Sequence, residues 1–228
     1  MRPAEVKRAL GPLPYMKLPQ GEYLHDFITK HNLRECLELG FYHGVSSAYL
    51  AGAIQDLGSG TLTTIDLLRA RDLRPNIEYV LASLGLAQYV EHYFEPASYT
   101  WRLMKFLEAG RHERYDFCYI DGGHTWDCTG FAFFLVTKLL KPGGWLLLDD
   151  LNWTIEVSKK LAALPWAMRL PLEQRQTPQV RNVYELLVKT DPQYGEFSVR
   201  GEWAFARKLP RSAPALDTAG SPCVGESK

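Results

Sequence analysis

A regular alternation of short apolar runs with stretches of helical periodicity most constrains how this chain can fold. Apolar runs of strand length lie at 34–39, 60–66, 89–94, 115–120 and 145–148. Stretches with the spacing of helices separate them, at 46–57, 76–84, 98–107 and 126–139. Strands that alternate with helices in this way predict a mostly parallel sheet with helices on both of its faces.

The two ends of the chain depart from this alternation. Four prolines in 1–20 exclude one continuous helix there, and a helix follows around Tyr23 and Phe27. After the fifth apolar run, the pattern predicts helices at 153–164 and 178–188 and a pair of antiparallel strands within 196–209. We therefore expect one domain over residues 1–209, in which 1–33 form an N-terminal cap segment bordering the site. The small, polar residues 210–228 are expected to be a disordered tail.

Composition excludes several classes of partner. The 228 residues carry 26 basic and 26 acidic side chains, so no net charge attracts nucleic acid or an anionic membrane surface. No apolar run approaches the roughly 20 residues of a membrane span, and the first ten residues do not resemble a secretory signal. The four cysteines have no CxxC spacing. We expect a cytoplasmic protein that binds neither nucleic acid nor membrane.

In a doubly wound sheet, ligands bind outside the carboxyl ends of the strands. The first such end has the sequence ELGFYHGVSS, which begins at Glu38 and differs from the GxGxxG of dinucleotide-binding enzymes. Gly40 and Gly44 allow a tight turn and close approach of the backbone to a ligand. Asp66 ends the second strand, where a carboxylate can bind two ribose hydroxyls or can cap a helix. Together these two strand ends predict a nucleoside site.

Four sequence strings carry a resemblance to a known family. ELGFYHGVSS, TLTTIDL, YDFCYIDGGH and LLKPGGWLLLDD resemble class I S-adenosylmethionine-dependent methyltransferases. The chain is most similar to the metal-dependent O-methyltransferases of the catechol and caffeoyl-CoA type and to their bacterial relatives that act on sugars and natural products. The resemblance extends from about Gln20 to Lys208. It implies a Rossmann-like α/β fold: a doubly wound, mostly parallel, seven-stranded sheet with one antiparallel strand.

The resemblance also assigns residues to the cofactor, S-adenosylmethionine. Glu38 matches an acid that fixes the turn and accepts hydrogen bonds near the cofactor's amino group, and Asp66 matches the acid that binds the ribose. The whole implied cofactor-binding set is Glu38, Gly40, Tyr42, Gly44, Ser46, Asp66, Ser98 and Asp121.

Three carboxylates follow the fourth and fifth strands. Asp121, Asp149 and Asp150 offer hard oxygen ligands from neighbouring strand ends, and the resembled family binds a divalent cation at the matching places. The sequence therefore predicts a site for Mg²⁺ or another divalent cation that would hold the substrate's oxygen. The alternative is that Asp149 and Asp150, with Asn152, only cap the following helix.

His124 is the candidate catalytic base. It stands where catechol-type enzymes have a lysine, and an imidazole with a pKa near 6.5 suits proton abstraction at neutral pH. This departure favours the bacterial relatives, several of which use a histidine base. The alternative is a histidine that only orders the loop before the 126–139 helix.

The acceptor is expected to be a small molecule with a hydroxyl group: a phenol, a sugar or a natural product. A set of large, mostly aromatic side chains could line its site or could simply pack the core: Tyr15, Met16, Tyr42, Trp126 and Trp153. Rival interpretations are a metal-free methyltransferase, an iron-dependent hydroxylase on the same scaffold and a non-catalytic protein that kept the fold. Many of the resembled enzymes are dimers, so a homodimer stays open.

Overall fold

The strands form one sheet whose order reverses at its middle. In the computed structural model, which describes residues 1–211, the strand order is β3-β2-β1-β4-β5-β7-β6. The strands are β1 (Glu35–Leu39), β2 (Thr61–Leu67), β3 (Val90–Glu95), β4 (Tyr115–Ile120), β5 (Leu140–Leu148), β6 (Tyr194–Arg200) and β7 (Trp203–Lys208). β7 pairs antiparallel with both β5 and β6, and every other pairing is parallel. The expectation of a seven-stranded sheet with one antiparallel strand is confirmed.

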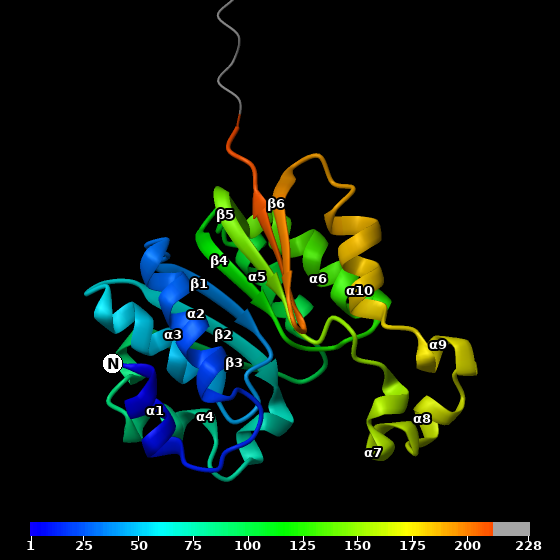
Figure 1. Ribbon diagram of the computed structural model, residues 1–228, viewed down its shortest axis with the longest axis horizontal. Helices are drawn as coiled ribbons and strands as arrows, with labels where there is room; N and C mark the ends of the chain where they lie inside the picture. The colour runs from blue at the N-terminus through cyan, green and yellow to red at the C-terminus, as the bar shows by residue number, and fades with distance from the viewer. Residues whose placement is uncertain (212–228) are drawn as a thin grey trace, which may run out of the picture.

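Helices cover both faces of this sheet (Figure 1). One face packs against α1 (Pro3–Leu10), α2 (Leu18–Lys30), α3 (Val45–Asp56) and α4 (Ile77–Ser83). The other face packs against α5 (Tyr99–Glu108), α6 (Trp126–Leu139) and α10 (Gln179–Val183), which continues into the π-helical turn η4 (Tyr184–Val188). Short 3₁₀ turns are η1 (Leu68–Asp72), η2 (Ala87–Tyr89) and η3 (Ile155–Val157).

The central strands are apolar on both sides because both sides are covered. In β4, Phe117 belongs to the core beneath α1–α4, whereas its neighbour Cys118 belongs to the core beneath α5 and α6. Both side chains are fully buried. Continuous apolar runs of this kind are expected of parallel strands between two helical layers.

The predicted helix at 153–164 is wrong. Residues after β5 form a loop, the turn η3 and then three short helices: α7 (Lys159–Ala162), α8 (Pro165–Met168) and α9 (Leu172–Gln176). Ser158 caps α7 by accepting a hydrogen bond from the Leu161 amide, and Pro165 starts a new helix rather than extending the previous one. We call residues 155–176 the arm; Figure 1 shows α7–α9 standing out from the body of the molecule.

Other boundaries differ less. β5 begins at Leu140, five residues before the predicted start, because Leu140 pairs with Tyr115 of β4 ahead of an irregularity in the register. The N-terminal residues form two helices rather than one, with Pro12 and Pro14 between them, as expected. The tail expected at 210–228 lies outside the described residues from 212 onward. No helix within residues 1–211 combines the length and apolarity that crossing a bilayer requires.

Candidate functional site

Three neighbouring strands deliver their carboxyl ends to the same place. The backbone hydrogen-bond ladder of the sheet continues one residue past each of these strands. The Gly40 amide donates to the Ile65 carbonyl (2.8 Å), the Asp121 amide to Leu39 (2.8 Å) and the Asp149 amide to Ile120 (3.0 Å). This edge opens into a cavity of about 580 Å³, within the size range of small-molecule sites. It lies at the β1–β4 reversal of the strand order, where ligands of doubly wound sheets bind.

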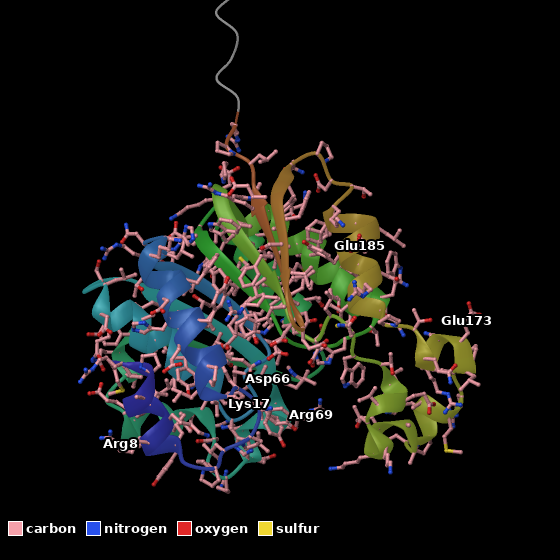
Figure 2. The ribbon with its side chains drawn as sticks, viewed as in Figure 1. Arg8, Lys17, Asp66, Arg69, Glu173 and Glu185 are labelled. Carbon is pink, nitrogen blue, oxygen red and sulfur yellow. The ribbon has the colours of Figure 1, made fainter. Side chains whose placement is uncertain are left out.

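Gly40 is needed at the turn after β1. Its φ is +94°, and a Cβ added there would lie 2.1 Å from the carbonyl oxygen of Asp121. Asp66 holds the turn from the end of β2, because its Oδ2 accepts hydrogen bonds from the amides of Phe41 (2.9 Å) and Tyr42 (2.6 Å). In Figure 2, Asp66 and Arg69, both of which line the cavity, are labelled at the lower end of the sheet.

Glu38 lies beneath this turn and not in the cavity. It is fully buried, its Oε2 accepts hydrogen bonds from the hydroxyls of Ser47 and Thr64, and its Oε1 has no partner. Burial raises the pKa of this carboxyl to about 7, against hydrogen bonds from Ser46, Ser47 and Thr64 that lower it. These hydrogen bonds connect β1 to α3 and to β2, and the role that the resemblance implies for Glu38 stays a prediction.

The structure brings most of the other predicted cofactor residues to the cavity. Ser98 caps α5, with its Oγ accepting from the Thr100 amide at 3.1 Å, and it lines the cavity wall. Gly44 stands behind the turn instead, where a Cβ would approach Ile77 to 2.7 Å. The predicted cofactor residues that line the cavity are Gly40, Tyr42, Ser46, Asp66, Ser98 and Asp121.

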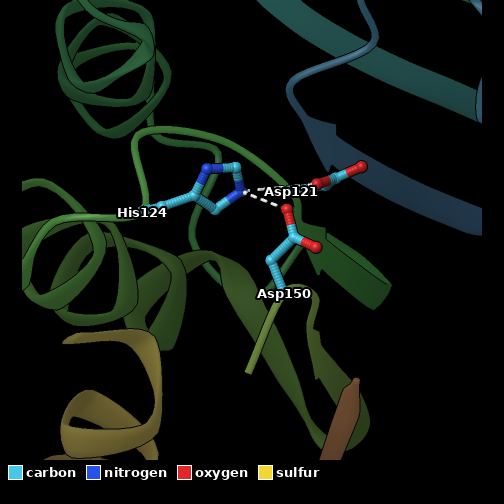
Figure 3. Close-up of side chains that lie close together, drawn as sticks. All are labelled: Asp121, His124 and Asp150. Carbon is cyan, nitrogen blue, oxygen red and sulfur yellow. Dashed lines mark ion pairs between the residues drawn. The ribbon is translucent and has the colours of Figure 1, made fainter. Parts of the chain in front are cut away.

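His124 points between two of the predicted carboxylates (Figure 3). Its Nε2 lies 3.2 Å from Oδ2 of Asp150 and 3.6 Å from Oδ1 of Asp121. Both His124 (φ +20°) and Asp150 (φ +56°) have positive φ, which side chains other than glycine rarely adopt. The three residues form a cluster, which we call the Asp-His-Asp cluster.

Asp149 is turned away from this cluster. One of its carboxylate oxygens accepts a hydrogen bond from the hydroxyl of Tyr119, and the other accepts from the Asp150 amide at 2.7 Å. Of the three predicted metal ligands, the structure therefore brings Asp121 and Asp150 together and adds His124 in place of Asp149. Asn152 also faces elsewhere, since its side chain bonds Glu202 and Arg181.

Tyr119 is a site residue that the sequence analysis missed. Its ring is fully buried, and its hydroxyl contacts both Asp149 and Asp121, the latter at 3.2 Å. The available signal was its place two residues before Asp121 in an otherwise apolar strand, because side chains two apart share a face. Arg69 and Glu202, which also line the cavity, carried no comparable signal.

Several aromatic side chains stand around the cluster. Trp153 packs against the His124 ring with 5.1 Å between ring centroids, and Tyr15 meets Tyr42 edge-to-face at the same separation. Met16 of the N-terminal segment also lines the cavity. Trp126 is exposed and does not line the cavity.

Burial and mutual charge set the protonation of the cluster. Burial disfavours the charged imidazolium of His124, but the neighbouring carboxylates of Asp121, Asp150 and Asp149 outweigh it, and the net pKa of His124 is raised. Burial raises the pKa of Asp150 and that of Asp121 as well, the proximity of Asp149 adding to both shifts. Several perturbed pKa values together in one cavity are typical of a functional site.

The cluster fits a divalent cation. His124 Nε2 is a buried nitrogen with no hydrogen-bond partner, and it faces two carboxylate oxygens. Buried polar atoms without a partner are rare in folded proteins, and a cation between these donors would satisfy the nitrogen. One imidazole and two carboxylates do not make the two-histidine iron triad of the hydroxylase alternative.

Comparison with known proteins places the fold. A family model described as "Methyltransferase domain" matches residues 37–151, which contain the glycine turn, Asp66 and the Asp-His-Asp cluster. A search of curated proteins finds no match.

Three solved structures illustrate the likeness in fold. TomG, an O-methyltransferase of Streptomyces achromogenes involved in tomaymycin synthesis and solved with SAM, aligns with a TM-score of 0.63 and 21% identity over 91% of this chain and 89% of that one. An O-methyltransferase from Bacillus cereus, solved with SAH, aligns with a TM-score of 0.62 and 21% identity over 90% of each chain. The SAH-bound methyltransferase PaMTH1 from Podospora anserina aligns with a TM-score of 0.63 and 14% identity over 91% of this chain and 87% of that one.

Proposed function

This chain belongs to the methyltransferase-domain family, and from that premise we propose that it transfers a methyl group from S-adenosylmethionine to a hydroxyl of a small molecule. One observation carries the proposal: the glycine turn with Asp66 and the Asp-His-Asp cluster line one cavity. A donor held at the turn and an acceptor held at the cluster would face each other there, and holding two reactants in line is a large part of catalysis.

The cofactor half of the cavity fits a nucleoside. When bound, S-adenosylmethionine would supply a methyl group already activated by the positive sulfonium. Gly40 lines the cavity and lets the turn pass close to the Asp121 backbone, and Asp66 lies at the cavity wall, where its carboxylate would accept hydrogen bonds from ribose hydroxyls. Ser46 and Ser98, which also line the cavity, provide further hydroxyls.

The acceptor half must remove a proton from the acceptor's hydroxyl. In the metal-free chain His124 is the proposed base: Nε2 accepts the proton, and Asp121 and Asp150 stabilise the imidazolium that forms. A divalent cation held by the cluster would supply a charge that favours the ionised acceptor. Trp153 and Tyr15 offer apolar walls for a planar or sugar acceptor.

Calorimetric titration with S-adenosylmethionine and S-adenosylhomocysteine tests the cofactor half. We expect micromolar binding that Asp66→Ala weakens about 10–100-fold, because a hydrogen bond to a charged group contributes about 1.5–3 kcal/mol. Asp72→Ala is the matched control, since Asp72 is exposed and outside this cavity. Absence of binding by the folded wild-type chain would overturn the proposal.

An acceptor screen then tests the reaction. Catechols, sugars and phenolic natural products would be incubated with the cofactor, with a divalent cation and after chelation, and the products analysed by mass spectrometry. In a metal-free methyltransferase with His124 as sole base, His124→Ala abolishes turnover and Asp121→Asn changes it little. A metal-assisted enzyme loses activity in both variants and after chelation.

A further inference from the structure

Four exposed side chains lie in a row along the outer side of α6, and we call them the α6 strip. They are Asp127, Phe131, Phe134 and Lys138. Steps of four, three and four residues return to the same side of a helix, because 3.6 residues complete a turn. Phe131 and Phe134 keep 52% and 54% of their surface exposed, and their rings stack with 6.3 Å between centroids. Adjacent large apolar side chains in water, unlike single ones, are typical of an interaction surface.

The neighbouring elements extend this apolar surface. α5 on one side and α10 with η4 on the other flank α6 over the same face of the sheet (Figure 1). Exposed apolar side chains on them are Trp101 and Met104 of α5 and Leu186 of η4. The 14 residues of α6 make a helix about 21 Å long and about 10 Å wide. Since each partner buries roughly 800 Å² in a stable dimer, the flanking side chains are needed to complete an interface.

The α6 strip is complementary to itself. The pair of Asp127 and Lys138 and the pair of Phe131 and Phe134 are centred on the same point, between residues 132 and 133. A two-fold axis through that point would bring Asp127 opposite Lys138 of the partner subunit. The same axis would bring Phe131 opposite the partner's Phe134. An interface between identical chains related by a two-fold axis requires a surface with this property.

The charges at the two ends of the strip have a second possible explanation. Asp127 lies in the first turn of α6 and Lys138 in the last, where an acid and a base each complement the helix dipole. The dipole does not account for the two exposed phenylalanines between them. It also does not account for the direction of the Lys138 side chain, whose Nζ lies over the Phe134 ring, 4.6 Å from its centroid, and so stays on the strip.

We propose that two copies of this chain associate through the α6 strip, with their α6 helices antiparallel about a two-fold axis. The phenylalanines of both copies form the apolar centre of the interface, and two pairs of Asp127 with Lys138 flank it. An apolar centre with a polar rim is the usual anatomy of protein–protein interfaces. Neither the phenylalanines nor the charged residues of the strip line the cavity, so this inference does not depend on the proposed function.

Sedimentation equilibrium of the full chain over a series of concentrations tests the association. We expect a monomer–dimer equilibrium in the micromolar range, as suits a small interface. Phe131→Ser should raise the dissociation constant at least about tenfold, because aromatic side chains at the centre of an interface carry much of its binding energy. Tyr79→Ser is the matched control, since Tyr79 is exposed on α4, over the opposite face of the sheet. A chain that stays monomeric throughout the series would overturn the proposal.

Charge reversal distinguishes antiparallel pairing through α6 from any other association. Asp127→Lys alone and Lys138→Glu alone would each place like charges opposite each other, so each should weaken the dimer at least about tenfold. The double variant makes the charges opposite again, and its dissociation constant should return toward the wild-type value. Within one chain the two side chains are three turns apart, about 16 Å along the helix, so their effects would simply add if the chains did not pair.

Two further measurements separate the interface from the stability of the helix and from the site. Both reversed charges oppose the helix dipole, so thermal unfolding of each variant identifies any that does not fold. A folded double variant that is weaker than either single variant would overturn the antiparallel pairing, as would dimerisation that Phe131→Ser leaves unchanged. Binding of S-adenosylhomocysteine by Phe131→Ser should equal that of the wild type, because Phe131 lies outside the cavity.

Discussion

Glu38 places a carboxyl group inside the protein, directly beneath the glycine turn. Its folded-state pKa of about 7 lies above the ordinary value of 4.5, so the folded protein holds a proton there that the unfolded chain releases between these pH values. The stabilising contribution of this proton is complete below about pH 4.5 and is lost as the pH rises through 7.

Glu38→Gln should remove this pH dependence. The amide keeps an oxygen acceptor for Ser47 and Thr64 and does not titrate. Between pH 4.5 and 7, the free energy of unfolding of the wild-type protein should fall by up to about 3 kcal/mol relative to the variant. Urea unfolding at a series of pH values measures the difference, and parallel curves for the two proteins would contradict the burial argument.

Tyr119→Phe should damage the site more than the core. The hydroxyl links Asp149 and Asp121, and its loss leaves two half-buried carboxylates without a shared donor. We expect about 1–3 kcal/mol of lost stability and slower methyl transfer. Tyr49→Phe is the matched control: the Tyr49 hydroxyl is buried without a partner, so its removal should be neutral or slightly stabilising. Equal effects of the two substitutions on turnover would argue against a role for Tyr119.

The sequence predicted which residues reach the site, but it did not predict the directions of their side chains. Gly40, Asp66, Asp121 and His124 could be located because they follow apolar strands, and position along a parallel strand determines the edge of the sheet that a residue reaches. The direction of a side chain beyond the strand end depends on the turn. Asp149 and Asp150 are adjacent and chemically identical in sequence, and the positive φ of Asp150 decides which of them faces His124.

At the scale of elements, the turn between β1 and α3 is the segment that we expect to tolerate substitution least. Gly40→Ala would put a Cβ 2.1 Å from the Asp121 carbonyl oxygen at a φ of +94°. We expect a loss of stability beyond the about 1–3 kcal/mol of backbone strain alone, together with weaker cofactor binding. Gly58→Ala separates the two effects, because Gly58 has a φ of +77° and open space around it. Comparable thermal stabilities for both variants would show that the clash is relieved.

The elements that sequence predicted well are those with long, regular patterns. The range of α6, 126–139, is as predicted, and β4 likewise spans its predicted residues 115–120. The prediction of a helix at 153–164 was wrong because it relied on apolar spacing and overlooked the residues that start new helices. Ser158 caps α7, and Pro165 begins α8. Short helices in the arm depend on contacts among themselves, which periodicity does not reveal.

At the scale of the whole molecule, the sheet joins two cores. Cys36 belongs to the core on one face of β1, and Leu37 and Leu39 belong to the core on the other. The cavity lies where β1, β2, β4 and β5 end, so a ligand bound there contacts the ends of strands that both cores hold in place. Neither core can lose its strands without exposing the other, which predicts one cooperative unfolding transition.

Thermal unfolding with S-adenosylhomocysteine tests this coupling and the site together. A ligand that binds only the folded state stabilises it by about 2.7 kcal/mol at 100 times its dissociation constant. For a domain of this size each kcal/mol raises the midpoint by roughly 2–4 °C, so we expect a single transition displaced upward by about 5–10 °C. Asp66→Ala at the same ligand concentration should show a much smaller displacement. Two resolved transitions, with only one moved by the ligand, would mean that the two faces of the sheet unfold separately and that the site belongs to one of them.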